Sequence, residues 1–241
     1  MSEHTPGDTW QQSDLATTFL ERRSDFVPLL DVQEDIVLRL LQRRGRPISR
    51  FLDLGCGDGA LTQLLVDAYP SAEVVMVDFS PPMLERAGER LRRIRVQGSL
   101  WRADLNDPSW ASELPSGGYD AVVSGLAIHH LPAERKRELF GELFGMLEPG
   151  GVFVNMDYVA VEGPLEGLFD EHRVGAVSAD PGSGSGGAGE PLPDDEDDDR
   201  PDLAEAQVGW MREAGFEQAE VQFKWAEAAV MAGFKPDREE R

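Results

Sequence analysis

An apolar strand that runs into alternating glycines constrains this chain more than any other feature. The run Phe51–Leu54 is followed by three glycines, Gly55, Gly57 and Gly59. A second apolar run, Val74–Val77, ends in Asp78. Glycine tolerates the positive φ angles of a sharp strand-to-helix turn and lets a ligand approach the backbone. An acid at this offset can accept hydrogen bonds from ribose hydroxyls. The pattern therefore predicts an α/β sheet that binds a nucleoside-bearing cofactor at its edge.

The glycine spacing leaves two cofactors open. Gly55, Gly57 and Ala60 satisfy the dinucleotide pattern, which permits alanine at its last position. Gly55, Gly57 and Gly59 satisfy a tighter alternate-glycine pattern. A dinucleotide would make the protein a dehydrogenase, whereas S-adenosylmethionine would make it a methyltransferase. A tight turn that holds no ligand is the third interpretation.

Composition restricts the partners of the chain. Its 241 residues include 45 acids and 23 bases, a net charge of −22, which argues against a nucleic-acid partner. No apolar run is long enough to span a membrane, and residues 1–10 lack the pattern of a signal peptide. Cys56 is the only cysteine, which excludes an intrachain disulfide or a cysteine-rich metal site. We expect a cytoplasmic protein with no membrane partner and no bound metal.

Predicted strands and helices alternate from residue 50 onward. Strands are predicted at Arg50–Leu54, Glu73–Val77, Ile94–Ala103, Tyr119–Ser124 and Gly151–Tyr158. Helices are predicted at Asp14–Arg23, Val32–Arg43, Leu61–Tyr69, Pro82–Arg92, Ala133–Leu147, Leu165–Val174 and Leu203–Glu213. The alternation favours a mostly parallel sheet that is covered on both faces. Two last strands, Phe216–Trp225 and Ala228–Phe234, resemble a hairpin.

The chain divides into four predicted regions. They are an N-terminal helical cap over residues 1–47, a cofactor-binding core over 48–177, an insertion over 178–202, and a C-terminal helix with a β-hairpin over 203–241. We expect the cap to cover the cofactor. The insertion is rich in glycine and serine and ends in six consecutive acids, Asp194–Asp199, so a flexible acidic loop is predicted. It is interpreted as a solvated insertion or as a docking segment for a basic partner.

Five ordered motifs resemble those of class I S-adenosylmethionine-dependent methyltransferases. They are Asp53–Gly59, the acid Asp78, the acid Asp104 after the third strand, the fourth-strand segment Tyr119–Leu131 and the turn Leu147–Gly151. The resemblance covers about residues 48–160 and 203–235. It implies a Rossmann-like α/β fold, in which helices flank both faces of a seven-stranded, mostly parallel sheet that ends in an antiparallel C-terminal hairpin strand. It also implies S-adenosyl-L-methionine as the cofactor.

The resemblance assigns roles to individual acids. It places Asp53 near the ammonium of the cofactor, Asp78 at the ribose, and Asp104 at the adenine amino group. A carboxylate at Asp53 would repel a dinucleotide pyrophosphate, which counts against a dehydrogenase. The expected cofactor-binding residues are Asp53, Gly55, Gly57, Gly59, Asp78, Asp104, Leu105 and Ser124.

The methyl acceptor is less constrained. His129, His130 and Tyr158 follow the fourth and fifth strands and are the candidate catalytic residues, although the histidines could instead shape the loop. We predict methyl transfer to oxygen or nitrogen of a small molecule. A methyltransferase of tRNA or another macromolecule, a synthase of a carboxylated cofactor, and a non-catalytic methyltransferase-like binding protein remain alternatives. The oligomeric state stays open.

Overall fold

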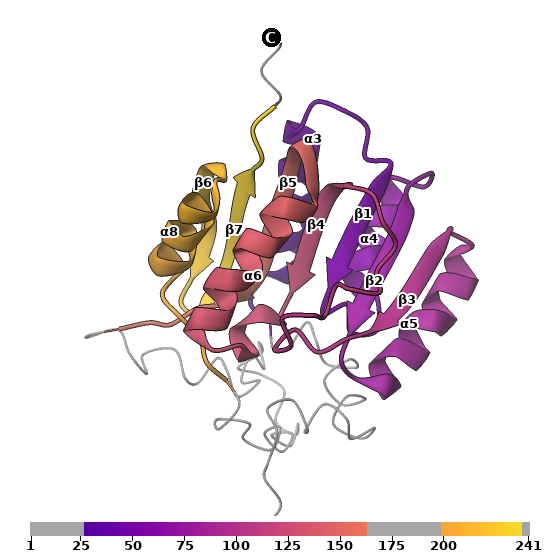
Figure 1. Cartoon of the computed structure of the whole chain (residues 1–241), viewed down its shortest axis with the longest axis horizontal. Coiled ribbons are helices and arrows are strands. Elements are labelled where there is room, and N and C mark those ends of the chain that lie inside the picture. The colour runs from indigo at the N-terminus through magenta and orange to yellow at the C-terminus, as the bar shows by residue number, and fades with distance from the viewer. Residues whose placement is uncertain (1–26, 163–198, 238–241) are drawn as a thin grey trace, which may run out of the picture.

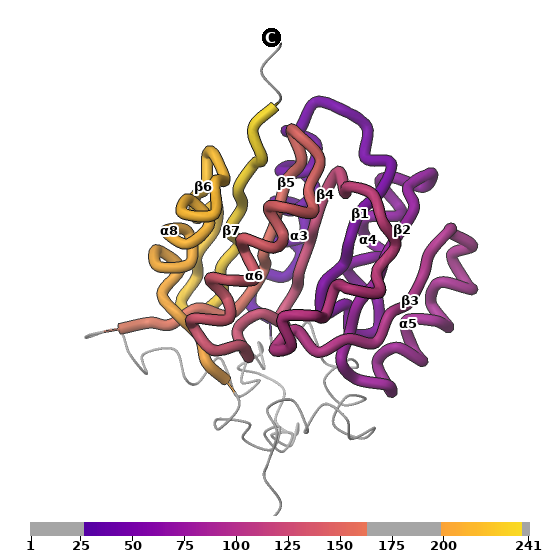
Figure 2. Tube along the Cα trace, in the orientation of Figure 1, coloured from indigo at the N-terminus to yellow at the C-terminus, as the bar shows by residue number. Residues whose placement is uncertain are grey.

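The computed structural model describes residues 27–162 and 199–237, which form a single seven-stranded sheet with helices on both faces (Figure 1). The strand order is β3-β2-β1-β4-β5-β7-β6. β7 runs opposite to the other six strands, and Figure 2 shows it lying between β5 and β6. The strands are β1 (Arg50–Leu54), β2 (Glu73–Asp78), β3 (Gly98–Arg102), β4 (Tyr119–Gly125), β5 (Leu147–Tyr158), β6 (Glu217–Trp225) and β7 (Ala228–Phe234). The helices are α3 (Leu30–Arg43), α4 (Ala60–Ala68), α5 (Pro81–Ile94), the short 3-10 helix η2 (Ile128–His130), α6 (Ala133–Met146) and α8 (Ala204–Ala214).

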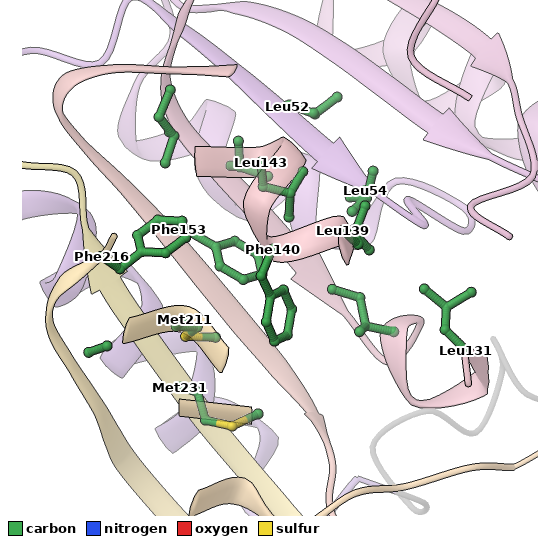
Figure 3. Close-up of a cluster of buried hydrophobic side chains, with 14 of the residues drawn as sticks. Leu52, Leu54, Leu131, Leu139, Phe140, Leu143, Phe153, Met211, Phe216 and Met231 are labelled. Atoms are coloured by element: carbon green, nitrogen blue, oxygen red, sulfur yellow. The ribbon is translucent and has the colours of Figure 1, made fainter. Parts of the chain in front are cut away.

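The buried parallel strands supply two hydrophobic cores because their side chains alternate between the faces. Leu52 and Leu54 of β1 belong to the core beneath α6 and α8, with Phe140 and Met211 (Figure 3). Phe51 of β1 points to the other face, where α3, α4 and α5 pack. This sandwich fixes the ends of the strands, and those ends carry the loops described below.

The predicted fold class is confirmed, and β1 and β7 have the predicted bounds. Two strand starts differ from the prediction by four residues each, and β6 starts one residue later than predicted, at Glu217. The strand predicted from Ile94 begins at Gly98, because α5 continues to Ile94 and ends where Arg95 adopts φ 56°. The strand predicted from Gly151 begins at Leu147, where pairing with β4 passes through a register shift.

Helix α3 packs against β5, β7 and α4, on one face of the sheet. The predicted helices Asp14–Arg23 and Leu165–Val174 lie outside the described residues, as does the predicted insertion up to residue 198. The cap and the four region boundaries stay predictions. Within the part of the chain that the structure describes, every helix is too short or too polar to cross a bilayer.

The two ends of the parallel strands carry different features, and we call the side where these strands begin the amino edge and the side where they end the carboxyl edge. At the amino edge, Arg44 pairs with Asp120 at 2.5 Å, and a cavity of about 550 Å³ lies between Gly118, Phe144 and Pro236. At the carboxyl edge lie the glycine loop after β1 and the ends of β2 to β5. Ligands of open α/β sheets bind outside the carboxyl ends of the strands, so this edge is the one to inspect.

Candidate cofactor and acceptor site

The glycine loop combines tight packing with one open surface. Gly55, Gly57 and Gly59 have φ values of 64°, 53° and 81°, in the left-handed region. A Cβ on Gly55 would lie 2.2 Å from the Cβ of Ala127, and one on Gly59 would lie 2.8 Å from Cε of Met76. A Cβ on Gly57 would meet no atom within 4 Å. Packing therefore requires glycine at Gly55, whereas at Gly59 the flexible end of Met76 would have to shift, and Gly57 presents bare backbone to open space.

The carboxylate of Asp78 is fixed against this loop. One of its oxygens accepts a hydrogen bond from the Gly57 N–H at 2.8 Å, and the other accepts from the Ser80 N–H at 2.8 Å. Burial raises the pKa of Asp78, while these hydrogen bonds and the nearby His130 oppose the rise. Each carboxylate oxygen has a second lone pair. Asp78 can therefore accept further hydrogen bonds beside the open surface of Gly57.

The other predicted cofactor residues are also placed around the loop. Asp53 is 1% exposed and accepts a hydrogen bond from the Thr62 hydroxyl at 2.6 Å, and the Ser124 hydroxyl donates to the Leu54 carbonyl at 2.8 Å. Asp104 accepts from the Asn106 N–H at 2.9 Å in a turn. That turn is next to Asp78, because the Ala103 N–H donates to the Asp78 carbonyl at 3.1 Å. The structure thus gathers the predicted acids at one edge and gives Ser124 a role in joining β4 to β1.

The three candidate catalytic residues come together around an unpredicted acid, Asp157. Its carboxylate holds His129 twice, at 2.5 Å from Nδ1 and at 3.0 Å from the backbone N–H. The Tyr158 ring lies edge-on to the His129 ring, with centroids 5.4 Å apart. His130 stacks at an angle on His129, with centroids 3.9 Å apart.

A second unpredicted acid, Asp199, contacts both histidines. Its Oδ1 lies 3.4 Å from His129 Nε2 and 3.2 Å from His130 Nδ1. Burial lowers the pKa of His129, but Asp157 and Asp199 outweigh it and raise the value to about 9. Burial raises the pKa of Asp199, but hydrogen bonds from the two histidines outweigh it and hold the value well below normal. In this arrangement His129 keeps its proton at neutral pH, so it is a poor general base.

Asp199 is the last of the six consecutive acids, and it begins a short strap, residues 199–202, whose other residues hold it in place. The Arg200 N–H donates to the His129 carbonyl at 3.0 Å. Lys136 of α6 is fully buried, and its Nζ donates to the Arg200 carbonyl and to Asp202 at 2.7 Å. Sequence reasoning could have found Lys136 and Asp157, because a lysine on the buried side of a helix and an acid at the end of a buried strand each need a partner. Nothing local distinguishes Asp199 from the five acids before it.

Comparison with known proteins agrees with this geometry. Residues 51–151 match the family model for a methyltransferase domain. A malonyl-[acyl-carrier protein] O-methyltransferase of Anoxybacillus flavithermus is 42% identical over 119 residues, which cover 49% of this chain and 43% of that protein. A trans-aconitate 2-methyltransferase of Methylobacterium radiotolerans is 33% identical over 140 residues, 58% of this chain and 47% of that protein. The chain thus matches about half the length of these curated relatives.

Solved structures extend the likeness to the whole fold. An S-adenosylmethionine-dependent methyltransferase from Clostridium acetobutylicum superposes with a TM-score of 0.63 at 14% identity, covering 92% of this chain and 98% of that one. Magnesium protoporphyrin IX methyltransferase from Synechocystis with bound SAH gives 0.61 at 16% identity, covering 95% and 97%. At these identities the likeness concerns the fold alone. The family match over residues 51–151, the curated relatives and the predicted motifs thus support the class I S-adenosylmethionine-dependent methyltransferase family, and the solved structures support its fold.

Proposed function

We propose that this protein binds S-adenosyl-L-methionine at the glycine loop and transfers its methyl group to an oxygen or nitrogen atom of a small molecule. The observation that carries the proposal is the pairing of Asp78 with Gly57, 2.8 Å apart, beside a backbone surface where a Cβ would meet nothing within 4 Å. A carboxylate next to bare backbone suits a ribose with two hydroxyls.

The donor set fits the rest of this cofactor. When bound, S-adenosylmethionine supplies an electrophilic methyl group on a sulfonium. Asp78 would hold the ribose hydroxyls, Asp104 would accept from the adenine amino group, and Asp53 would attract the ammonium group. The carboxylate of Asp58 already pairs with Arg90, so it is less available to the cofactor.

The chain's contribution to methyl transfer is then orientation of the acceptor and exclusion of water. His129 and His130 follow β4 and Tyr158 ends β5, so all three lie at the carboxyl edge, where an acceptor could reach the cofactor. His129 keeps its proton at neutral pH in this arrangement, which favours acceptors that need no strong base. The relative named for trans-aconitate supports an acceptor of small size, whereas the relative named for malonyl-[acyl-carrier protein] is named for a small acyl group carried on a protein.

The macromolecular alternative has less support, because a net charge of −22 disfavours contact with tRNA phosphates. Only a measurement of turnover distinguishes an enzyme from a methyltransferase-like protein that binds the cofactor without catalysis.

The proposal is tested by calorimetry followed by a turnover assay. Calorimetric titrations with S-adenosylmethionine, S-adenosylhomocysteine and NAD should give binding for the first two only. Asp78→Ala should weaken S-adenosylmethionine binding by about 1–3 kcal/mol, because it removes the ribose acceptor. A panel of carboxylates, phenols and amines is then screened for release of S-adenosylhomocysteine. Binding of NAD alone would refute the cofactor, and binding without turnover on any acceptor would favour the non-catalytic protein.

A further inference from the structure

We propose that His129, His130 and Asp199 bind a divalent transition-metal ion, with Zn²⁺ as the best match. Each residue offers one ligand atom, and these atoms all lie within 4.8 Å of one another. Two imidazoles and one carboxylate form a ligand set that suits zinc and neighbouring transition metals better than Mg²⁺ or Ca²⁺.

The distances agree with a metal held between these groups. Bonds from Zn²⁺ to nitrogen or oxygen are about 2.0–2.2 Å, so two ligands of a tetrahedral ion lie about 3.3–3.6 Å apart. The separations from Asp199 Oδ1 are 3.4 Å to His129 Nε2 and 3.2 Å to His130 Nδ1. The two separations that involve Asp199 thus suit a bound ion, while the two histidine nitrogens, which lie within 4.8 Å of each other, would have to approach to the same spacing.

The surroundings of His129 have the form of a metal-site support. A histidine that binds a metal usually donates its other ring N–H to a carboxylate, which fixes its tautomer and orientation. Asp157, which is 1% exposed, lies 2.5 Å from His129 Nδ1 and leaves Nε2 to face Asp199. Asp157 also accepts hydrogen bonds from the His129 and Tyr158 backbone N–H groups. The ring of His129 is thus oriented before any ion arrives.

Asp199 is likewise positioned by the strap. The buried Lys136 binds Asp202 and the Arg200 carbonyl, and the Arg200 N–H binds the His129 carbonyl. The carboxylates of Asp157 and Asp199 bring two negative charges into a largely buried cluster, and Asp78 is close enough to interact electrostatically with His130. This excess of acids favours a cation, and Zn²⁺ would take the place of the proton on His129 Nε2, because histidine binds a metal in its neutral form. Three protein ligands leave a coordination position open, as in catalytic zinc sites.

The test is a Zn²⁺ titration of the full chain after treatment with a chelator. Calorimetry should show one tight equivalent. Asp199→Asn and His130→Ala should each weaken Zn²⁺ binding at least tenfold, and Asp157→Asn by about 10–100-fold. The matched control is a triple variant, Asp194→Asn with Asp195→Asn and Asp197→Asn, which removes charge from the same acidic run and should bind within twofold of the wild type.

Loss of binding in the triple variant but not in Asp199→Asn would show that the acidic run captures zinc, and would overturn the site. Absence of a tight equivalent in the wild type would also overturn it and leave an ion-paired cluster. Circular dichroism checks that each variant folds. If one does not, the Co²⁺ spectrum of the wild type decides, because imidazole ligands in a site of low coordination number give strong visible bands, whereas hydrated Co²⁺ gives weak ones. None of these measurements requires methyltransferase activity.

Discussion

At the scale of single residues, two neighbouring glycines are expected to fail in different ways. Both need a left-handed φ, so alanine costs each of them about 1–2 kcal/mol. Gly55→Ala also drives its Cβ to 2.2 Å from Ala127, which adds about 1–3 kcal/mol of overpacking. Gly57→Ala meets no protein atom within 4 Å, but it places a methyl group on the proposed cofactor surface. Urea denaturation and calorimetry with S-adenosylmethionine measure the two effects.

Gly55→Ala should therefore lose about 2–5 kcal/mol of the free energy of unfolding. Gly57→Ala should lose only about 1–2 kcal/mol of the free energy of unfolding, yet bind the cofactor at least tenfold more weakly. Each variant serves as the control for the other. Unchanged cofactor affinity in Gly57→Ala would contradict the proposed location of the cofactor.

Cys56 lies inside the same loop and is expected to be unreactive. Burial raises the pKa of its thiol well above normal, and the carboxylates of Asp78, Asp53 and Asp58 add to the rise. The thiolate fraction falls about tenfold for each pKa unit of the rise, and the thiolate is the form that reacts. At pH 8 the folded chain should react with iodoacetamide at least tenfold more slowly than the same chain in urea. Equal rates would mean that the loop opens readily.

At the scale of secondary-structure elements, the strength of the local signal decided what could be predicted. β1 and β2 are buried on both faces, so their apolar runs mark them clearly. The boundary between α5 and β3 was misplaced because Ile94 and Val96 continue the apolar pattern, while the helix ends at Arg95 in a conformation that favours glycine. Arg95 adopts this left-handed conformation because of the packing of the whole fold, and a local sequence pattern carries no information about that packing.

The turn after β3 is tied to α6 by an arginine whose loss should be costly. Arg135 donates to the Leu105 carbonyl at 2.7 Å and to both oxygens of Glu142 at 2.8 Å, and the Trp110 indole also donates to Glu142 at 2.7 Å. Arg135→Met should cost about 1.5–3 kcal/mol of the free energy of unfolding, because it breaks hydrogen bonds to a charged group. The control on the same helix is Arg137→Met, whose exposed pair with Glu213 is worth about 0–1 kcal/mol. Equal costs for the two variants would contradict the network.

The same network predicts a pH dependence. Burial raises the pKa of Glu142, but hydrogen bonds from Arg135 and Trp110 outweigh it and lower the value below the ordinary 4.5. A lowered pKa means that Glu142 stabilises the folded state above pH 4.5, and that this contribution is lost as the pH falls through the folded value. Urea denaturation between pH 6 and about pH 3 should therefore show a shallower loss of stability in Glu142→Gln than in the wild type. A parallel loss in both proteins would contradict this assignment.

At the scale of the whole molecule, the sequence predicted the sheet but missed Asp157 and Asp199, the two acids that contact the histidines. The glycine loop and Asp78 are close along the chain and carry a family pattern, so they were found. Asp157 was not predicted because a single acid at the end of an apolar run usually marks only the place where the strand ends. Asp199 is brought to His129 by long-range contacts, of Lys136 with Asp202 and of the Arg200 N–H with the His129 carbonyl, which no local pattern reports.

The net charge of −22 predicts the response of the whole fold to salt. Like charges repel one another more in the compact state than in the unfolded chain, and this repulsion is screened over about 10 Å at 0.1 M salt. The melting temperature should therefore rise as NaCl increases from near zero to 0.3 M. The control variant replaces the acids of residues 194–198 by their amides, which removes five negative charges from the chain. That variant should start from a higher melting temperature in low salt and gain less from added NaCl. A melting temperature that falls with salt in the wild type would mean that attractive pairs such as Arg44–Asp120 outweigh the general repulsion.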